Sequence, residues 1–395
     1  MTASILLCPV CKESLQANES NKSLSCVNNH SFDRARQGYL NLLLAHKKKS
    51  KNPGDSQEMV IARQAFLNSD FYQPISDSLN EIVSSIILKL KETQAEEIPY
   101  QVLDIGCGEG YYSQRLHNSL SDSGIDHNVY GLDISKEAIL AAAKRAKAVQ
   151  DKDSEWLVAS AIDIPLQEKS IDIATCLFTR LMPESYHKVI KQDGYFICVN
   201  TGEKHLIELR EKLYDQITKV EFDPIKNMGD DFELIEQQQV NYQNTLSSQQ
   251  QIQDLLLMTP HNWRTKAENK ETLSALEELT VTIDAQIHVF KAKAKAEVVE
   301  AVIETIVTEK TIEEVATTTT VEAEAISPKT KSTSVNPWAK AAEKPAAPVA
   351  DKLVQEESTL KDDTPEEASV EIEAPVEIKD NKETSSAKVN PWAKS

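Results

Sequence analysis

The chain has 395 residues, a mass of 44.1 kDa and a formal net charge of −19, with a sequence pI of about 5.0. This length predicts two or three domains, and the acidic balance excludes a protein that coats nucleic acid with its whole surface. All ten glycines lie at or before Gly229, and residues 296–395 carry 21 acids against 11 bases, so this last part is not expected to build a core.

Residues 1–45 contain a pattern of metal ligands. Cys8 and Cys11 form a C-x2-C pair, and after fourteen intervening residues Cys26 and His30 form a C-x3-H pair. Zinc prefers thiolate and imidazole ligands, and four of them fill its tetrahedron without leaving a place for water. We therefore predict a structural zinc ion that stabilises a segment too small to fold on a core of its own. The alternative is that the four residues are unrelated side chains of a loop.

The start of the chain and the other cysteines indicate a reducing compartment. The sequence does not open with a basic segment and a long apolar stretch, and no apolar run approaches the roughly 20 residues of a membrane span. We expect a cytoplasmic protein, no membrane partner and free thiols. Cys107, Cys176 and Cys198 are then predicted to be small, buried side chains at strand ends.

Residues 46–98 join a basic linker to a helical segment. Positive side chains gather over residues 34–51 without an acid among them, and from Ile75 onward apolar residues recur every three or four positions. The recurrence predicts helical structure with one apolar face over residues 56–91. The basic side chains are Arg34, Arg36, Lys47, Lys48, Lys49 and Lys51.

Strands and helices alternate across residues 99–291. This rhythm predicts an α/β fold, with a parallel sheet covered by helices on both faces. Two looser runs, 232–245 and 279–290, are predicted to form a hairpin-like pair, with a helix over 247–258 between them. The expected buried strands are 101–105, 129–134, 156–159, 171–176 and 195–200, and the other expected helices are 111–120, 136–149, 181–190 and 204–219.

The turn after the first of these strands predicts a nucleoside site. Gly106, Gly108 and Gly110 separate a strand from a helix, and Asp133 ends the next strand. Glycines let the backbone approach a ligand, and a carboxylate at the second place accepts hydrogen bonds from ribose hydroxyls. Because the turn lacks the third glycine of the dinucleotide motif, a ribose without a pyrophosphate suits it better than NAD does. We predict S-adenosylmethionine as the ligand, with a purely structural turn as the alternative.

Residues 292–395 have the composition of an acidic tail. Glu, Ala, Val and Lys dominate first, followed by Pro, Thr and Ser, and the hexapeptide Val-Asn-Pro-Trp-Ala-Lys occurs at residues 335–340 and again at 389–394. We expect a largely disordered tail. The alternative is a tail whose two repeats dock onto an unknown partner, because tryptophan beside proline suits a partner's pocket.

These motifs together resemble those of known methyltransferases. The turn from Gly106 to Gly110, with Asp133, resembles motifs I and II of class I S-adenosylmethionine-dependent methyltransferases. The Cys3His pattern and the motifs after it resemble the 23S rRNA (guanine-N1)-methyltransferases in order and spacing over residues 5–291, without the tail. The motifs are Phe32-Asp33, Gly38-Tyr39-Leu40-Asn41-Leu42-Leu43, Asn52-Pro53-Gly54-Asp55-Ser56, Met59, Ala62-Arg63, Ala65-Phe66-Leu67 and Tyr72.

The resemblance implies a class I methyltransferase with a Rossmann-like sheet, an N-terminal zinc-binding module and 23S rRNA as substrate. The expected reaction methylates N1 of a guanine in the helix 35 hairpin of domain II, at guanine 745 in one branch of the family and at 748 in a sister branch. The run from His46 to Asp55 is more similar to the first branch. The basic residues, with Arg63, are then expected to contact RNA phosphates rather than form a solvated linker. The family also implies a homodimer.

The resemblance also implies which residues bind the cofactor. Tyr72 and His205 join the glycine turn, although Tyr72 also suits packing against the sheet and His205 also suits a helix cap. Asp163 lies where class I enzymes often hold the adenine amino group. Residues 178–183 depart from the family pattern, because Pro183 is displaced and Arg180 has no clear counterpart, so the resemblance does not assign the details of the substrate loop. The full expected set is Tyr72, Gly106, Gly108, Glu109, Gly110, Asp133, Asp163 and His205.

The implied chemistry depends on proximity and on loss of a proton. In-line transfer of a methyl group from a sulfonium needs alignment, guanine N1 must lose its proton, and the base must leave its stack. Glu109 is expected to contact the cofactor and Asp104 to order the turn, so no general base is assigned. Two alternatives are a small-molecule methyltransferase whose zinc module only supports folding, and a non-catalytic RNA-binding adaptor. The intact glycines and Asp133 argue against the adaptor.

Overall fold

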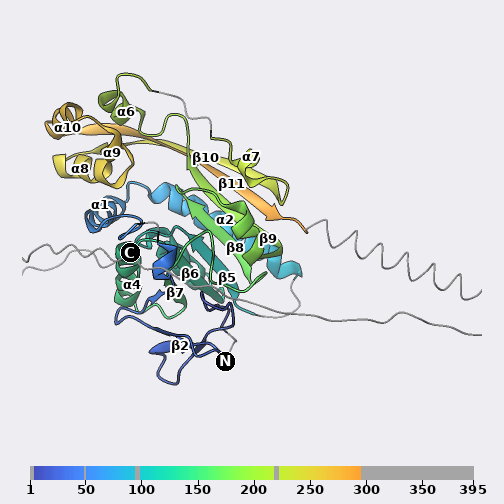
Figure 1. Ribbon diagram of the computed structural model, residues 1–395. Helices are drawn as coiled ribbons and strands as arrows, with labels where there is room; N and C mark the ends of the chain where they lie inside the picture. The colour runs from blue at the N-terminus through green and yellow to red at the C-terminus, as the bar shows by residue number, and fades with distance from the viewer. Residues whose placement is uncertain (1–3, 49, 94–97, 218–221, 295–395) are drawn as a thin grey trace, which may run out of the picture. The chain divides into compact units, whose positions relative to one another are not determined.

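The computed structural model describes residues 4–48, 50–93, 98–217 and 222–294, and the expected tail lies outside them. A sheet of eight strands forms the centre of this part (Figure 1). Its strands in spatial order are β10 (Phe232–Leu246), β11 (Leu279–Ala292), β9 (Ile190–Thr201), β8 (Ile171–Leu177), β5 (Tyr100–Ile105), β6 (His127–Asp133), β7 (Ser154–Val158) and β4 (Leu40–Asn41).

The directions of these strands confirm the predicted parallel sheet. The strands β5 to β9 and β4 pair in parallel, whereas β11 runs antiparallel to both β9 and β10. The predicted hairpin-like pair is thus the β10–β11 ladder, in which Phe232 faces Ala292. Every residue of β8 is buried, as expected of a strand covered on both faces.

Five of the helices in this region fall where the sequence predicts helices, whereas three short ones were not predicted. The five are α3 (Tyr111–Asp122), α4 (Lys136–Ala148), α5 (Pro183–Val189), α6 (Ile207–Leu213) and α8 (Gln249–Met258), and the three are α7 (Pro224–Met228), α9 (His261–Arg264) and α10 (Ala267–Ser274). The predicted helix over 204–219 is wrong at both ends. At its start Leu206 has a left-handed backbone (φ 53°) and the N–H of Lys204 donates to Asp284, and at its end α6 stops at Leu213, so residues 214–217 are not helical. Residues 218 and 219 lie outside the described part.

The predicted helical stretch over 56–91 is divided in two. The first helix, α1 (Gln57–Leu67), begins where the hydroxyl of Ser56 accepts a hydrogen bond from the N–H of Met59. The second, α2 (Gln73–Thr93), starts after a turn in which Asp70 has φ 61°. A non-glycine residue in this left-handed region ends a helix, so the two helices take separate directions.

The zinc module has its own small sheet and joins the large one. The antiparallel strands β1 (Gln16–Ala17), β2 (Ser23–Ser25) and β3 (Ser31–Asp33) form it, and a short 3-10 helix, η1 (Ala45–Lys47), follows β4. The joint is made by β4, which pairs with the edge strand β7, and by the N–H of Leu7, which donates to the carbonyl of Pro165 at 2.9 Å. The module thereby covers an edge that would otherwise be open to pairing with another chain.

Buried residues on the two faces of the sheet fix the core. One group packs α2, α3 and α8 against the sheet, and another joins apolar residues of the zinc module to the opposite face. Cys107, Cys176 and Cys198 are all buried, as predicted. In the described residues, helices long and apolar enough to cross a bilayer do not occur.

Candidate functional site

The four predicted zinc ligands come together in the structure. Their ligand atoms all lie within 4.8 Å of one another. Nδ1 of His30 is 3.6 Å from Sγ of Cys8 and 3.4 Å from Sγ of Cys26, and the sulfurs of Cys11 and Cys26 are 3.6 Å apart. Ligands bound about 2.0–2.3 Å from a tetrahedral zinc ion are separated by similar distances. The donor set therefore fits a structural zinc ion.

Two tight turns hold these ligands in place. In the first, Lys12 has φ 63° and its N–H donates to the carbonyl of Cys8 at 2.9 Å. In the second, Asn29 has φ 62° and its N–H donates to the carbonyl of Cys26, also at 2.9 Å. A left-handed backbone is costly for residues other than glycine. Metal binding supplies the free energy that such a small module needs to hold these turns.

The glycine turn leads from β5 to α3 and leaves one glycine open to a cavity. All three glycines have positive φ, at 74°, 58° and 81° for Gly106, Gly108 and Gly110. A Cβ on Gly106 would lie 2.8 Å from Thr179, and one on Gly110 would lie 2.9 Å from Trp156. A Cβ on Gly108 would meet only the guanidinium of Arg63, at 3.6 Å. Two of the glycines thus allow packing, and Gly108 lets a ligand approach the backbone.

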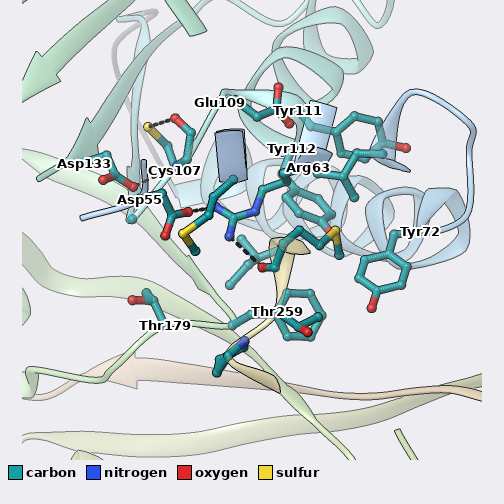
Figure 2. A pocket seen from close by; sticks show the side chains of 18 of the residues that line it. Asp55, Arg63, Tyr72, Cys107, Glu109, Tyr111, Tyr112, Asp133, Thr179 and Thr259 are labelled. Atoms are coloured by element: carbon teal, nitrogen blue, oxygen red, sulfur yellow. Dashed lines mark hydrogen bonds and ion pairs between the residues drawn. The ribbon is translucent and has the colours of Figure 1, made fainter. Parts of the chain in front are cut away.

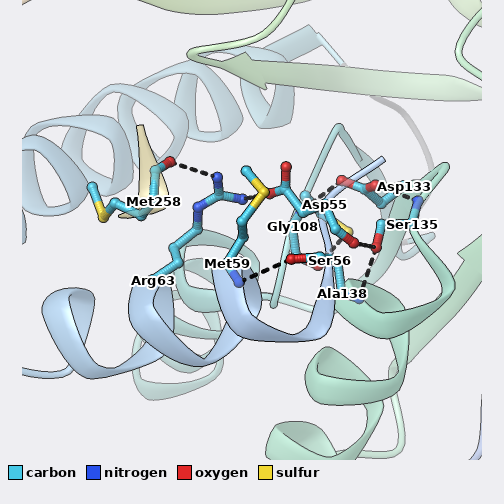
Figure 3. Close-up of polar contacts among 10 residues, drawn as sticks. Asp55, Ser56, Met59, Arg63, Gly108, Asp133, Ser135, Ala138 and Met258 are labelled. Atoms are coloured by element: carbon cyan, nitrogen blue, oxygen red, sulfur yellow. Dashed lines mark hydrogen bonds and ion pairs between the residues drawn. The ribbon is translucent and has the colours of Figure 1, made fainter. Parts of the chain in front are cut away.

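Asp133 lies at the end of β6 and faces this turn (Figure 3). One carboxylate oxygen accepts the N–H of Gly108 at 3.0 Å, and the other accepts the N–H of Ser135 at 2.7 Å. Burial raises the pKa of Asp133, although both backbone hydrogen bonds oppose the shift. The carboxylate is held at the cavity wall, where its remaining lone pairs suit the hydroxyls of a ribose.

Glu109 also lines the cavity, but its side chain is already paired. One carboxylate oxygen is 2.5 Å from the guanidinium of Arg145 on α4. Its other oxygen is buried and has no hydrogen-bond partner among the described residues. Burial raises the pKa of Glu109 against the attraction of Arg145. An unsatisfied buried acceptor at a cavity wall fits the donor groups of a bound ligand.

Tyr72 and His205 meet across the cavity from two turns far apart in the chain, one before α2 and one before α6. Nε2 of His205 lies 3.0 Å from the hydroxyl of Tyr72, and its Nδ1 accepts the N–H of Asp284 at 3.2 Å. Burial lowers the pKa of His205 to about 4, so the ring is neutral at neutral pH. Since Nδ1 accepts, Nε2 carries the proton and donates it to Tyr72. The hydroxyl hydrogen of Tyr72 is then free to donate to a ligand.

Asp163 does not join the other predicted cofactor residues. Its carboxylate is held 2.5 Å from Lys12 of the zinc module and 2.6 Å from Lys47. Burial would raise the pKa of Asp163, but the hydrogen bonds from the two lysines outweigh it and the pKa is lowered. The described cavity lining does not include this side chain. The structure instead gives Asp163 the role of a tie between the zinc module, the linker and the sheet.

Arg63, which the sequence predicts to contact RNA phosphates, lines the cavity together with Asp55, for which the sequence predicts no role. Figure 3 shows their ion pair above Gly108, and Arg63 also donates to the carbonyl of Met258 at 3.1 Å. The pair therefore connects α1 to α8 across the cavity. Both residues belong to motifs of the family resemblance, and that was the one signal that could have identified them.

The cavity that these residues line has a volume of about 730 Å³ (Figure 2). Small-molecule sites span about 300–1,000 Å³ and combine apolar walls with a few polar groups. Here the polar groups are the glycine turn, Asp133, Glu109 and the Tyr72–His205 pair, and Met59 and Ile134 add apolar surface. The arrangement fits S-adenosylmethionine, whose ribose, amino-acid and sulfonium parts need such mixed surroundings.

Comparisons with known proteins agree with this assignment. Residues 6–51 match the family model of the RlmA N-terminal zinc ribbon, and residues 99–273 match that of a methyltransferase domain. The chain is also similar to a Bacillus subtilis protein whose name places it among the 23S rRNA (guanine-N1)-methyltransferases. The two are 29% identical over 289 residues, which cover 72% of this chain and 96% of the relative.

Two further relatives differ in how much of the chain they match. The 23S rRNA (guanine(748)-N(1))-methyltransferase of Streptomyces fradiae is 29% identical over 53% of this chain and 67% of its own length. The demethylmenaquinone methyltransferase of Oceanobacillus iheyensis is 29% identical over 35% of this chain and 62% of its own length. The chain thus has the class I fold of an S-adenosylmethionine-dependent methyltransferase and carries an N-terminal zinc ribbon of the RlmA type.

Proposed function

We propose that this protein methylates N1 of a guanine in 23S rRNA, within the helix 35 hairpin and at guanine 745. The observation that carries the proposal is the combination, in one chain, of the zinc ribbon with the cofactor cavity. The relative from Bacillus subtilis supports it, because the similarity covers 72% of this chain and 96% of the relative, and its name describes the same reaction. The motifs of the linker support position 745 over 748.

The residues of the cavity are proposed to bind and align the cofactor. Asp133 accepts the ribose hydroxyls, Gly108 lets the cofactor pass close to the backbone, and Tyr72 donates its free hydroxyl hydrogen. Bound S-adenosylmethionine supplies an electrophilic methyl group. The protein contributes alignment of that methyl group with N1 and exclusion of water, which together account for much of the rate of such transfers.

The basic run is proposed to contribute an RNA surface, but not with all of its members. Arg34 is 2.8 Å from Glu155 and Lys47 is 2.6 Å from Asp163, so both have protein partners. Arg36, Lys48 and Lys51 are exposed beside the zinc module. Exposed basic side chains of this kind contact phosphates and steer RNA toward a site even when the net charge of the protein is negative. Lys49 lies outside the described residues.

The proposal also includes the domain bounds, the oligomeric state and the location of the protein. We place the zinc-binding RNA-recognition module at residues 1–45, the basic linker and helices at 46–98, the catalytic domain at 99–291 and the acidic tail at 292–395. A homodimer that forms one RNA cleft and a cytoplasmic location accompany the family resemblance. A monomer by light scattering, with full activity, would contradict the dimer.

Mapping the product on RNA tests the reaction and its position together. Purified protein and labelled S-adenosylmethionine are incubated with 23S rRNA that lacks this modification, and the product is read by primer extension. A methyl group on N1 blocks the pairing edge, so we expect a new stop one nucleotide before guanine 745. A stop before guanine 748 would show that 748, and not 745, is the methylated nucleotide. Label elsewhere in the RNA would show that the helix 35 hairpin is not the substrate.

The second candidate function is a small-molecule methyltransferase. The similarity to a demethylmenaquinone methyltransferase favours it, but that similarity covers 35% of this chain, against 72% for the Bacillus subtilis relative. Demethylmenaquinone added to the same assay separates the two functions. Label in the quinone and none in RNA would support this second function and reject the first.

A further inference from the structure

Two aromatic side chains line the cavity and remain open to solvent. Phe178 is 37% exposed and Trp263 is 70% exposed, although both border the cavity. Tryptophan is highly buried on average in folded proteins, and exposed apolar surface next to a pocket marks a place where a ligand or partner binds. Neither side chain has a role in the cofactor site described above.

The backbone of Phe178 is held in an unusual conformation. This residue follows β8 directly and has φ 53°, a left-handed conformation that is a clear outlier for a bulky side chain. Its N–H donates to the carbonyl of Val199 at 2.8 Å, which fixes the turn. Strain of this kind persists where the surrounding structure imposes it, and it gathers at functional sites.

The turn places the Phe178 ring against the buried polar pair of Tyr72 and His205. Its centroid is 6.0 Å from that of His205, with an angle of 27° between the planes, and 5.9 Å from that of Tyr72. The next residue, Thr179, packs against Gly106. The Phe178 ring is thus supported by two aromatic neighbours, and the next residue packs against the glycine turn.

Trp263 stands on an anchored turn of the chain. It belongs to α9, in which Nδ1 of His261 lies at hydrogen-bond distance, 2.8 Å, from the hydroxyl of Tyr214. Thr265 donates its hydroxyl to the carbonyl of His261 at 2.7 Å, which closes the turn from the other side. The ring is therefore presented to solvent by a fixed backbone.

We propose that Phe178 and Trp263 form an aromatic clamp that stacks on the target guanine after it leaves the RNA. This inference rests on the proposed function and adds the residues that recognise the substrate base. A guanine whose N1 meets the methyl group has lost the stacking of its neighbours. Flat aromatic side chains beside the cofactor replace that stacking, as they do in single-stranded RNA recognition. Stacking holds any purine, so it positions the ring, and hydrogen bonds on the base edge select guanine.

Substitutions that remove or keep the aromatic ring test the clamp. Trp263→Ala and Phe178→Leu are compared with Trp263→Phe and Phe178→Tyr, with an RNA hairpin as the acceptor. Each alanine or leucine variant is expected to lower kcat/KM about ten-fold or more, and the aromatic variants to retain most of it. Cofactor affinity, measured by calorimetry with S-adenosylhomocysteine, should stay within about two-fold. Trp338→Ala, outside the described residues, is the matched control and should leave both values unchanged.

The outcomes separate this inference from the function on which it rests. If the unaltered protein transfers no methyl group to RNA, the proposed function fails and the clamp fails with it. If it methylates RNA and Trp263→Ala does so equally well, only the clamp is rejected. A loss that Trp263→Phe does not rescue, or a parallel loss of cofactor affinity, would likewise reject stacking in favour of a structural role.

Discussion

The sequence predicts that Asp133 and Asp163 both bind the cofactor, but the two carboxylates lie in different surroundings. Asp133 lines the cavity beside Gly108, whereas Asp163 is held by two lysines outside it. We predict that Asp133→Asn weakens S-adenosylhomocysteine binding about ten-fold or more, because hydrogen bonds to a charged group contribute about 1.5–3 kcal/mol each. Calorimetry measures the affinity. Asp163→Asn makes the same chemical change and should bind normally, and an equal loss in both variants would refute the assignment.

The lowered pKa of His205 makes the free energy of unfolding depend on pH. Burial lowers its pKa from 6.5 to about 4, so the unfolded chain binds more protons than the folded protein between these values. The stabilisation is complete above about pH 6.5 and falls as the pH drops toward 4, by at most about 3 kcal/mol. We expect His205→Gln to reduce the loss of unfolding free energy on acidification, measured by urea denaturation at several pH values. Identical pH profiles for both proteins would contradict this role.

At the scale of elements, the zinc ribbon folds around a metal ion and is fastened to the sheet by β4. Cys11→Ser is predicted to lower the zinc content from about one ion per chain and to loosen the ribbon, because the module cannot fold on its small core. Zinc analysis and protease sensitivity of the first 45 residues measure the two effects. Cys198→Ala, which removes a buried thiol far from the ligands, should keep the zinc. Full zinc retention by Cys11→Ser would disprove the ligand set.

The elements also explain what the sequence could predict. The zinc ligands and the glycine turn were identified because their spacing is local, and the strands because their apolar runs are short and clearly bounded. The break between α1 and α2 was missed although the polar cluster Asn68-Ser69-Asp70 is typical of a turn, because the apolar period from Ile75 onward was extended across it. The contact between Arg63 and Met258 joins residues 195 positions apart, and such pairing depends on the complete fold.

At the scale of the whole molecule, an acidic protein is expected to bind RNA through one basic surface. Replacing Arg36, Lys48 and Lys51 together by Gln should weaken RNA binding and make it less sensitive to salt, by about 0.7–0.9 in log–log slope for each lost phosphate contact. Fluorescence anisotropy over a range of salt concentrations gives the slope. The matched control changes three exposed lysines elsewhere, Lys89, Lys91 and Lys152, and should keep the slope. Equal slopes in all three proteins would show that Arg36, Lys48 and Lys51 do not contact RNA.

Transfer to a single defined atom is the most direct test of the central claim. Two synthetic helix 35 hairpins are offered with labelled S-adenosylmethionine, and they differ only in whether the target guanine already carries a methyl group on N1. We predict label in the unmodified hairpin, recovered as N1-methylguanosine after digestion, and background label in the premethylated one. Equal labelling of both hairpins, or label recovered in any other nucleoside, would contradict the claim that this protein is a guanine-N1 methyltransferase of this RNA.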